Sequence, residues 1–84
     1  MKEKEIGRVF DFFAKIGVAA IKVTGPLNIG DKIHIKGGTT DITQEVTSMQ
    51  SHNKNIEKAK KGGEIGIKVE DRVRKNDKIF VVKE

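Results

Sequence analysis

The sequence predicts an all-β domain, and two observations carry this prediction. Glycine-containing turns precede segments in which isoleucine alternates with other residues, most clearly at Gly25–Ile35 and Ala59–Ile67. Glycine supplies the backbone angles of a sharp turn, and alternating isoleucines fit a strand with one buried face. Six short strands joined by such turns predict a small closed six-stranded antiparallel β-barrel, because closure removes exposed sheet edges.

The expected strands, in chain order, are Glu5–Phe12, Val18–Val23, Lys32–Lys36, Asp41 to about Gln50, Glu64–Val69 and Lys78–Val82. The first is rich in valine and phenylalanine, but both of its faces mix apolar and polar side chains, so its buried side is not evident. After a turn at Ala14–Gly17, the second buries alternate residues from Ala19 onward. The third is the most regular, with Ile33 and Ile35 inward and His34 outward.

The fourth strand follows a glycine turn at Lys36–Thr40. Met49 falls out of phase with Ile42 and Val46, which indicates a β-bulge within this strand. The polar stretch that follows is irregular, with one helical turn expected over Ile56–Lys60. The fifth and sixth strands resume the alternation and complete the domain.

Length and composition limit the number of domains, the kinds of cross-link and the cellular location that we expect. Its 84 residues make one domain, 1–84, and without cysteine it can form neither a disulfide nor a thiolate metal site. A charged fraction of 35% is compatible with a thermophile. The start carries charges of both signs, and the longest apolar run, Ile16–Ile21, is far below the ~20 residues that span a bilayer. We therefore expect a soluble cytoplasmic protein without a membrane partner.

The net charge of +5 is unevenly distributed: residues 1–53 carry seven Lys/Arg against six Asp/Glu, and residues 54–84 carry ten against six. Such an excess raises the chance of a nucleic-acid partner, although interspersed acidic residues favour a merely solubilising surface on charge alone. The candidate phosphate-binding residues are Lys58, Lys60, Lys61, Arg72, Arg74 and Lys75. The chain has only four phenylalanines, and most of the three clustered at Phe10, Phe12 and Phe13 are expected in the core, so phosphate contacts would dominate over base stacking.

Signatures of catalysis, cofactors and metals are weak. Lys36–Thr40 has its lysine before the glycines and is better explained as a hairpin turn than as a phosphate loop, so no GTP binding is expected. Ser51 and His52 lie close in sequence, but nothing holds them against Asp41 as a catalytic triad requires. His34, on the solvent face between two lysines, and His52 make a poor zinc site. We predict no catalytic, cofactor-binding or metal-binding residues and a protein that is not an enzyme.

Several motifs nevertheless occur in a recognisable order, namely Gly7–Val9, Ile29–Ile33, Val46–Gln50 and Ala59–Ile67. This order resembles the second, β-barrel domain of translational GTPases such as elongation factor Tu and archaeal elongation factor 1-alpha. The resemblance runs from about Ile6 to Val82. Asn76 stands where that family usually has glycine, and asparagine tolerates left-handed backbone angles. A similar barrel also closes some collagenase-like peptidases, and these motifs do not separate the two groups.

The resemblance implies a stand-alone, non-catalytic accessory module of translation. In that family the domain contacts ribosomal RNA and the acceptor end of aminoacyl-tRNA, so the expected partners are ribosomal RNA, tRNA or a translation-related protein. The alternative is a protein-interaction adaptor, or a subunit barrel of a larger enzyme, with no RNA binding.

Overall fold

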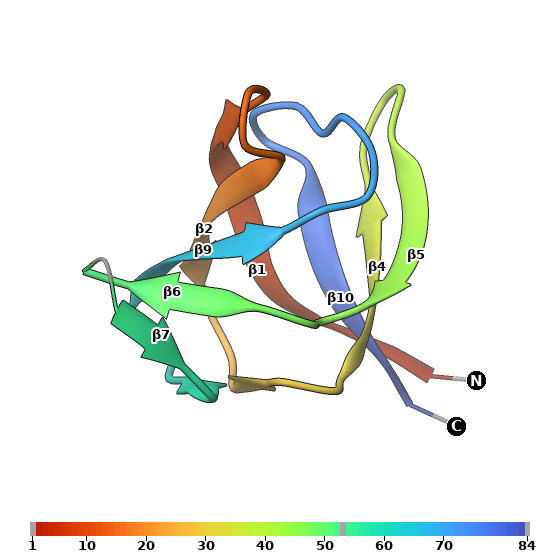
Figure 1. The fold of residues 1–84 in the computed structure, drawn as a ribbon. Coiled ribbons are helices and arrows are strands. Elements are labelled where there is room, and N and C mark those ends of the chain that lie inside the picture. The colour runs from red at the N-terminus through yellow and green to blue at the C-terminus, as the bar shows by residue number, and fades with distance from the viewer. Residues whose placement is uncertain (1, 53, 84) are drawn as a thin grey trace.

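The computed structural model describes residues 2–52 and 54–83, which form strands and turns without a helix (Figure 1). The strands are β1 (Lys2–Phe13), β2 (Val18–Val23), β3 (Leu27–Asn28), β4 (Lys32–Lys36), β5 (Asp41–Glu45), β6 (Met49–Ser51), β7 (Lys54–Ile56), β8 (Lys58–Ala59), β9 (Glu64–Lys68) and β10 (Lys78–Lys83). Eight pair in the order β5-β4-β10-β1-β2-β9-β6-β7, while β3 pairs with β8. All these pairs are antiparallel, so the predicted all-β class is confirmed.

The main sheet curls around the core but does not close, and β5 and β7 remain its two edges (Figure 1). The predicted closed six-stranded barrel is therefore wrong in closure and in strand number. Between β5 and β6 the chain crosses from one half of the sheet to the other at Val46. The Val46 N–H donates to the Asp31 carbonyl at 2.8 Å, and the Val46 carbonyl accepts from the Gly30 N–H at 2.8 Å. The expected bulge in one long strand is instead a break between two strands.

The Gln44 side chain bridges the gap between the two halves of the sheet. It is buried, with 6% of its surface exposed. Its Nε2 donates to the Lys68 carbonyl at 2.9 Å, and its Oε1 accepts from the Glu70 N–H at 2.9 Å. One side-chain amide thus links β5 to the end of β9 and to the residues that follow it.

The core is formed by the inward residues of these strands, the most deeply buried being Val9, Ala19, Ile21, Leu27, Ile33, Ile35 and Ile79. β4 buries alternate residues, as the sequence predicts. In β2 the predicted Ala19, Ile21 and Val23 are buried, but so is Ala20 between them. In β1 the pairing register shifts between Glu5 and Gly7 against β10, and between Val9 and Asp11 against β2. Each bulge changes which residues face inward, and this explains why no single alternation fits this strand.

The same tight turn precedes β4 and β10, at Asn28–Asp31 and Arg74–Asp77. In each turn the aspartate N–H donates to the carbonyl of the first residue, at 3.1 and 3.2 Å. The aspartate carboxylate in turn accepts from the first residue's N–H, at 2.9 and 2.8 Å. The third residue is left-handed in both, with φ of 92° at Gly30 and 74° at Asn76. Asparagine therefore takes the position of glycine in this turn, as expected.

The helical turn expected over Ile56–Lys60 is absent, and β7 and β8 occupy this stretch instead. The pairing of β8 with β3 places Ala59 opposite Leu27, and both residues are buried. This small sheet covers one end of the core, seen below the main sheet in Figure 1. β3 and β8 contain two residues each, which is too few for an alternating pattern to be recognised in the sequence.

Candidate docking surface

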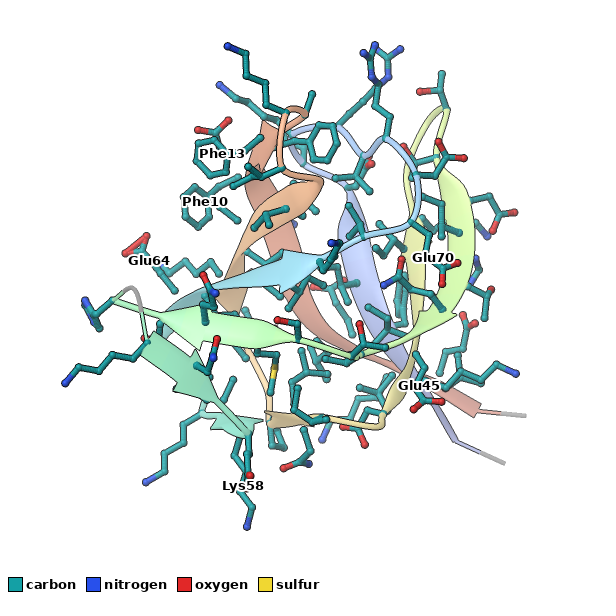
Figure 2. All side chains as sticks on the ribbon, in the orientation of Figure 1. Phe10, Phe13, Glu45, Lys58, Glu64 and Glu70 are labelled. Carbon is teal, nitrogen blue, oxygen red and sulfur yellow. The ribbon has the colours of Figure 1, made fainter. Side chains whose placement is uncertain are left out.

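Large apolar side chains are exposed on the outer face of β1 and in the turn that leads to β2. Phe10, Phe13 and Ile16 are 44%, 48% and 63% exposed, and together we call them the apolar patch. Figure 2 shows Phe10 and Phe13 side by side and pointing away from the sheet. The expectation that most of these phenylalanines lie in the core is wrong, since of the β1 phenylalanines only Phe12 packs against it.

The bulge between Val9 and Asp11 explains part of this exposure, because it shifts the alternation so that Phe12 packs on the core with Val9 and Phe13 faces outward. The sequence carried a signal that was not used. Consecutive strand residues point to opposite faces, so Phe12 and Phe13 cannot both be buried in one strand. One exposed phenylalanine was therefore predictable.

The apolar patch borders a shallow hollow of about 270 Å³. Its floor includes Ala20 and Gly66, which lie opposite each other in the pairing of β2 with β9. A Cβ atom at Gly66 would lie 3.0 Å from Val18 Cγ1, so the floor is low because the residue there is glycine. The polar side of the hollow consists of Gln50, His52 and Glu64. A floor of small residues beside aromatic walls can receive an apolar side chain of a partner.

Two further hollows adjoin the same face. One of about 420 Å³ lies on the other side of Phe10 and includes Arg8 and Lys22. Another, of about 290 Å³, shares Ile16 and Gly66 with the first hollow. Exposed apolar side chains between concavities with polar margins are typical of a protein-binding surface.

The outer face of β5, β4, β10 and β1 is different, and we call it the charged face. His34 lies at its centre with its side chain 15% exposed. Its Nδ1 lies 2.7 Å from Glu3 Oε2 and its Nε2 lies 2.5 Å from Asp41 Oδ1. The hydrogen bond with Asp41, followed by the hydrogen bond with and the charge of Glu3, raises the pKa of His34 above its usual 6.5 against the opposing effect of burial. His34 lies on the outer face between Lys32 and Lys36, as the sequence predicts, but the carboxylates of Glu3 and Asp41 cover its ring, which the sequence does not show.

The residues considered for catalysis are not brought together. Asp41 on β5 contacts His34, whereas Ser51 and His52 lie at the β6–β7 turn beside the hollow. Within residues 2–52 and 54–83, no three His, Asp or Glu side chains are placed to hold a metal ion. The same residues include no helix that could cross a membrane.

The six predicted phosphate-binding residues fall into two separate sets, Lys58, Lys60 and Lys61 before β9, and Arg72, Arg74 and Lys75 after it. The Gly62 N–H bonds to the Val23 carbonyl at 2.7 Å, and the Val69 N–H bonds to the Gly17 carbonyl at 2.9 Å. These contacts place the two sets at opposite ends of β2, roughly 20 Å apart at the usual rise per strand residue. They do not form one basic site, and RNA binding by either set stays a prediction.

Known proteins resemble the chain in sequence. An uncharacterised protease of Methanocaldococcus jannaschii is 46% identical over 81 residues, which are 95% of this chain and 20% of that protein. A collagenase of Porphyromonas gingivalis is 39% identical over 77 residues, 89% of this chain and 21% of that protein. The chain thus spans about a fifth of the length of these relatives. Among models of known protein families, none matches the chain.

Two crystal structures show the same fold. Both are of the C-terminal domain of a Geobacillus thermoleovorans protein assigned to the U32 peptidases. The selenomethionine variant superposes with a TM-score of 0.86 at 15% identity, covering 90% of this chain and 96% of that domain. The other has a TM-score of 0.83 at 16% identity, covering 88% and 86%.

These comparisons overturn the expected relation to translation. The relatives at 46% and 39% identity are named protease and collagenase, so the expectations of an elongation-factor-like module and of a ribosomal role are wrong. The names protease and collagenase also do not support the expectation that the protein is not an enzyme. The chain is similar in sequence to one fifth of these proteins and in fold to the C-terminal domain of a protein assigned to the U32 peptidases.

Proposed function

We propose that this chain is an accessory, non-catalytic β-domain that serves a U32-type peptidase by binding protein. The observation that carries the proposal is the pattern of coverage. Nearly all of the chain, 95%, matches the M. jannaschii protease, yet this accounts for only 20% of that protein. The remaining four fifths offer ample room for a separate catalytic part.

The surface of the chain also supports a role in binding protein and not in catalysis. Its most exposed apolar side chains surround a shallow hollow, which suits contact with another protein. The polar cluster around His34 holds the imidazole between carboxylates on both nitrogens. A histidine engaged in this way has no free nitrogen to act as a general base.

A graft into a relative tests the proposal. The matched segment of the P. gingivalis collagenase is replaced by this chain, and a second version has the segment deleted. Cleavage of fluorescently quenched gelatin is then measured for both proteins, for the unaltered collagenase and for the 84-residue chain alone. We expect activity in the graft, loss of activity on deletion, and none in the chain alone.

Two outcomes contradict the proposal. Hydrolysis of gelatin by the chain alone would show that it is itself catalytic. A graft as inactive as the deletion, although its circular dichroism shows it folded, would show that the chain does not serve such a peptidase.

A further inference from the structure

We infer that the apolar patch is the face by which this domain docks on the catalytic part of a U32-type peptidase. This inference rests on the proposed function and adds the surface and its occupant. Docking would place an apolar side chain of the catalytic part in the hollow above Ala20 and Gly66. The polar side of this hollow, at Glu64, would then face a basic side chain of the occupant.

The physical reason to expect an occupant is the exposure of the patch. Phe10 and Phe13 are about half exposed and Ile16 is 63% exposed, and all three line the same hollow. Contiguous exposed apolar surface beside hollows marks an interaction site more often than a solvated surface. The pairing of Ala20 with Gly66 provides a low floor, where larger side chains would fill the hollow.

The size of the patch selects the kind of occupant. A phenylalanine buries roughly 150–250 Å² when it is fully covered, so three half-exposed side chains offer roughly 300 Å². A stable complex of separate proteins buries about 800 Å² on each partner. Contacts between domains of one chain extend to smaller areas, because the covalent link supplies a high effective concentration. The patch therefore suits a tethered catalytic part better than a second copy of this chain.

The charged face does not compete for this role. Lys36 lies opposite Asp41, and Lys32 lies opposite Glu45, across the β4–β5 pair. Opposite charges at such positions attract one another across the strands. A partner that covered this face would have to remove these charges from water.

The test uses the full-length graft described above, with a readout other than activity. Phe10→Ser and Phe13→Ser are introduced together into the grafted chain, and Ala20→Leu, which fills the hollow without removing the phenylalanines, is made as a second variant. The matched control is Lys32→Ser with Lys36→Ser on the charged face. Docking is measured as the rate of limited proteolysis at the junction between the grafted domain and the catalytic part.

We expect slow cleavage of the graft and of the control, and cleavage at least about tenfold faster in both patch variants, which corresponds to about 1.4 kcal/mol of lost docking free energy. Equal rates in all four proteins would overturn the inference. The same substitutions in the 84-residue chain, followed by thermal unfolding, separate loss of docking from loss of folding.

Two further results distinguish the possible failures. If the graft cleaves gelatin but the patch variants stay docked, the docking face is wrong while the proposed function holds. If the isolated chain sediments as a dimer that Phe10→Ser and Phe13→Ser dissociate, the occupant is a second copy and the inference fails. We expect a monomer.

Discussion

The charged face and the apolar patch lie on different parts of the outer side of the same curled sheet, and they differ in the side chains that they expose to water. On the charged face, lysines lie opposite carboxylates and His34 is held by Glu3 and Asp41. On the other face, the apolar patch leaves aromatic and aliphatic side chains exposed around a hollow. The first face exposes charged and polar groups to water, whereas the second exposes large apolar side chains, which is why we propose a partner for it. Solvent exposure alone therefore does not identify a binding surface, because exposed large apolar patches are more informative than exposed charged residues.

The largest effect is expected at the residue that joins the two halves of the sheet. Gln44→Ala would leave the Lys68 carbonyl and the Glu70 N–H without their partner. Unpaired groups of this kind cost about 1–3 kcal/mol each, so we expect a loss of about 2–4 kcal/mol in the free energy of unfolding. Urea denaturation measures the change. The control, Gln50→Ala on the exposed surface, should cost less than about 0.5 kcal/mol, and an equal cost for both would refute the bridging role of Gln44.

The next effect separates the inner and outer sides of β1. Phe12 packs against the core whereas Phe13 is 48% exposed. Phe12→Ala should therefore destabilise the chain by about 2–3 kcal/mol, because it leaves a cavity, and Phe13→Ala by less than about 1 kcal/mol. Thermal and urea unfolding of both variants give the comparison. A larger loss for Phe13→Ala would mean that the patch stabilises the isolated fold and is no docking surface.

A smaller effect, dependent on pH, is expected on the charged face. The pKa of His34 is raised in the folded chain above its usual value of 6.5. Its charged contacts therefore stabilise the fold fully below about pH 6 and are lost as pH rises through the folded pKa. With partners as exposed as Asp41, we expect His34→Gln to cost about 1 kcal/mol at about pH 6 and almost nothing at about pH 9.

The partners of His34 sharpen this prediction. Hydrogen bonding to Asp41 is the largest cause of the raised pKa, so Asp41→Asn should lower the pKa of His34 more than Glu3→Gln does. Titration of the imidazole by NMR measures both shifts. A His34 pKa at or below its usual value in the unaltered chain would contradict the arrangement.

The smallest effects are expected from the two basic sets. Replacing Lys58, Lys60 and Lys61, or Arg72, Arg74 and Lys75, by serine should change the free energy of unfolding by about 0.5 kcal/mol or less. Because the sets lie at opposite ends of β2, their contributions to retention on immobilised RNA should add independently. If replacing both sets reduces retention on RNA far more than the sum of the two separate reductions, the two sets form one RNA-binding site.

Much of the fold was predictable because its regular strands repeat a clear alternation. The alternating isoleucines of β4 and β9 gave their extents to within one residue. The break after Glu45 was not predictable, since it depends on hydrogen bonds from Val46 to a loop distant in sequence. Alternation places Gln44 on the same face as Ile42 and Val46, but nothing in the sequence indicates which backbone groups its side chain bonds.

The candidate site was less accessible than the fold. Net charge drew attention to lysines and arginines that the structure keeps in two separate sets. The apolar patch was hidden because a bulge at Phe10 changes the alternation of β1. The motifs reflect only shared turns, so they could not separate a likeness to peptidases from a likeness to translation factors. The similarity over 95% of the chain to a protein named as a protease shows the first.

The pairing of the first strand with the last has a mechanical consequence. β1 and β10 are antiparallel from Lys2↔Lys83 onward, so the two ends of the domain leave from the same corner (Figure 1). A pulling force applied between these ends would load the hydrogen bonds of this pair one after another, in the unzipping geometry. It would not load them all at once, as in the shear geometry. The domain should therefore peel open at low force and refold when released.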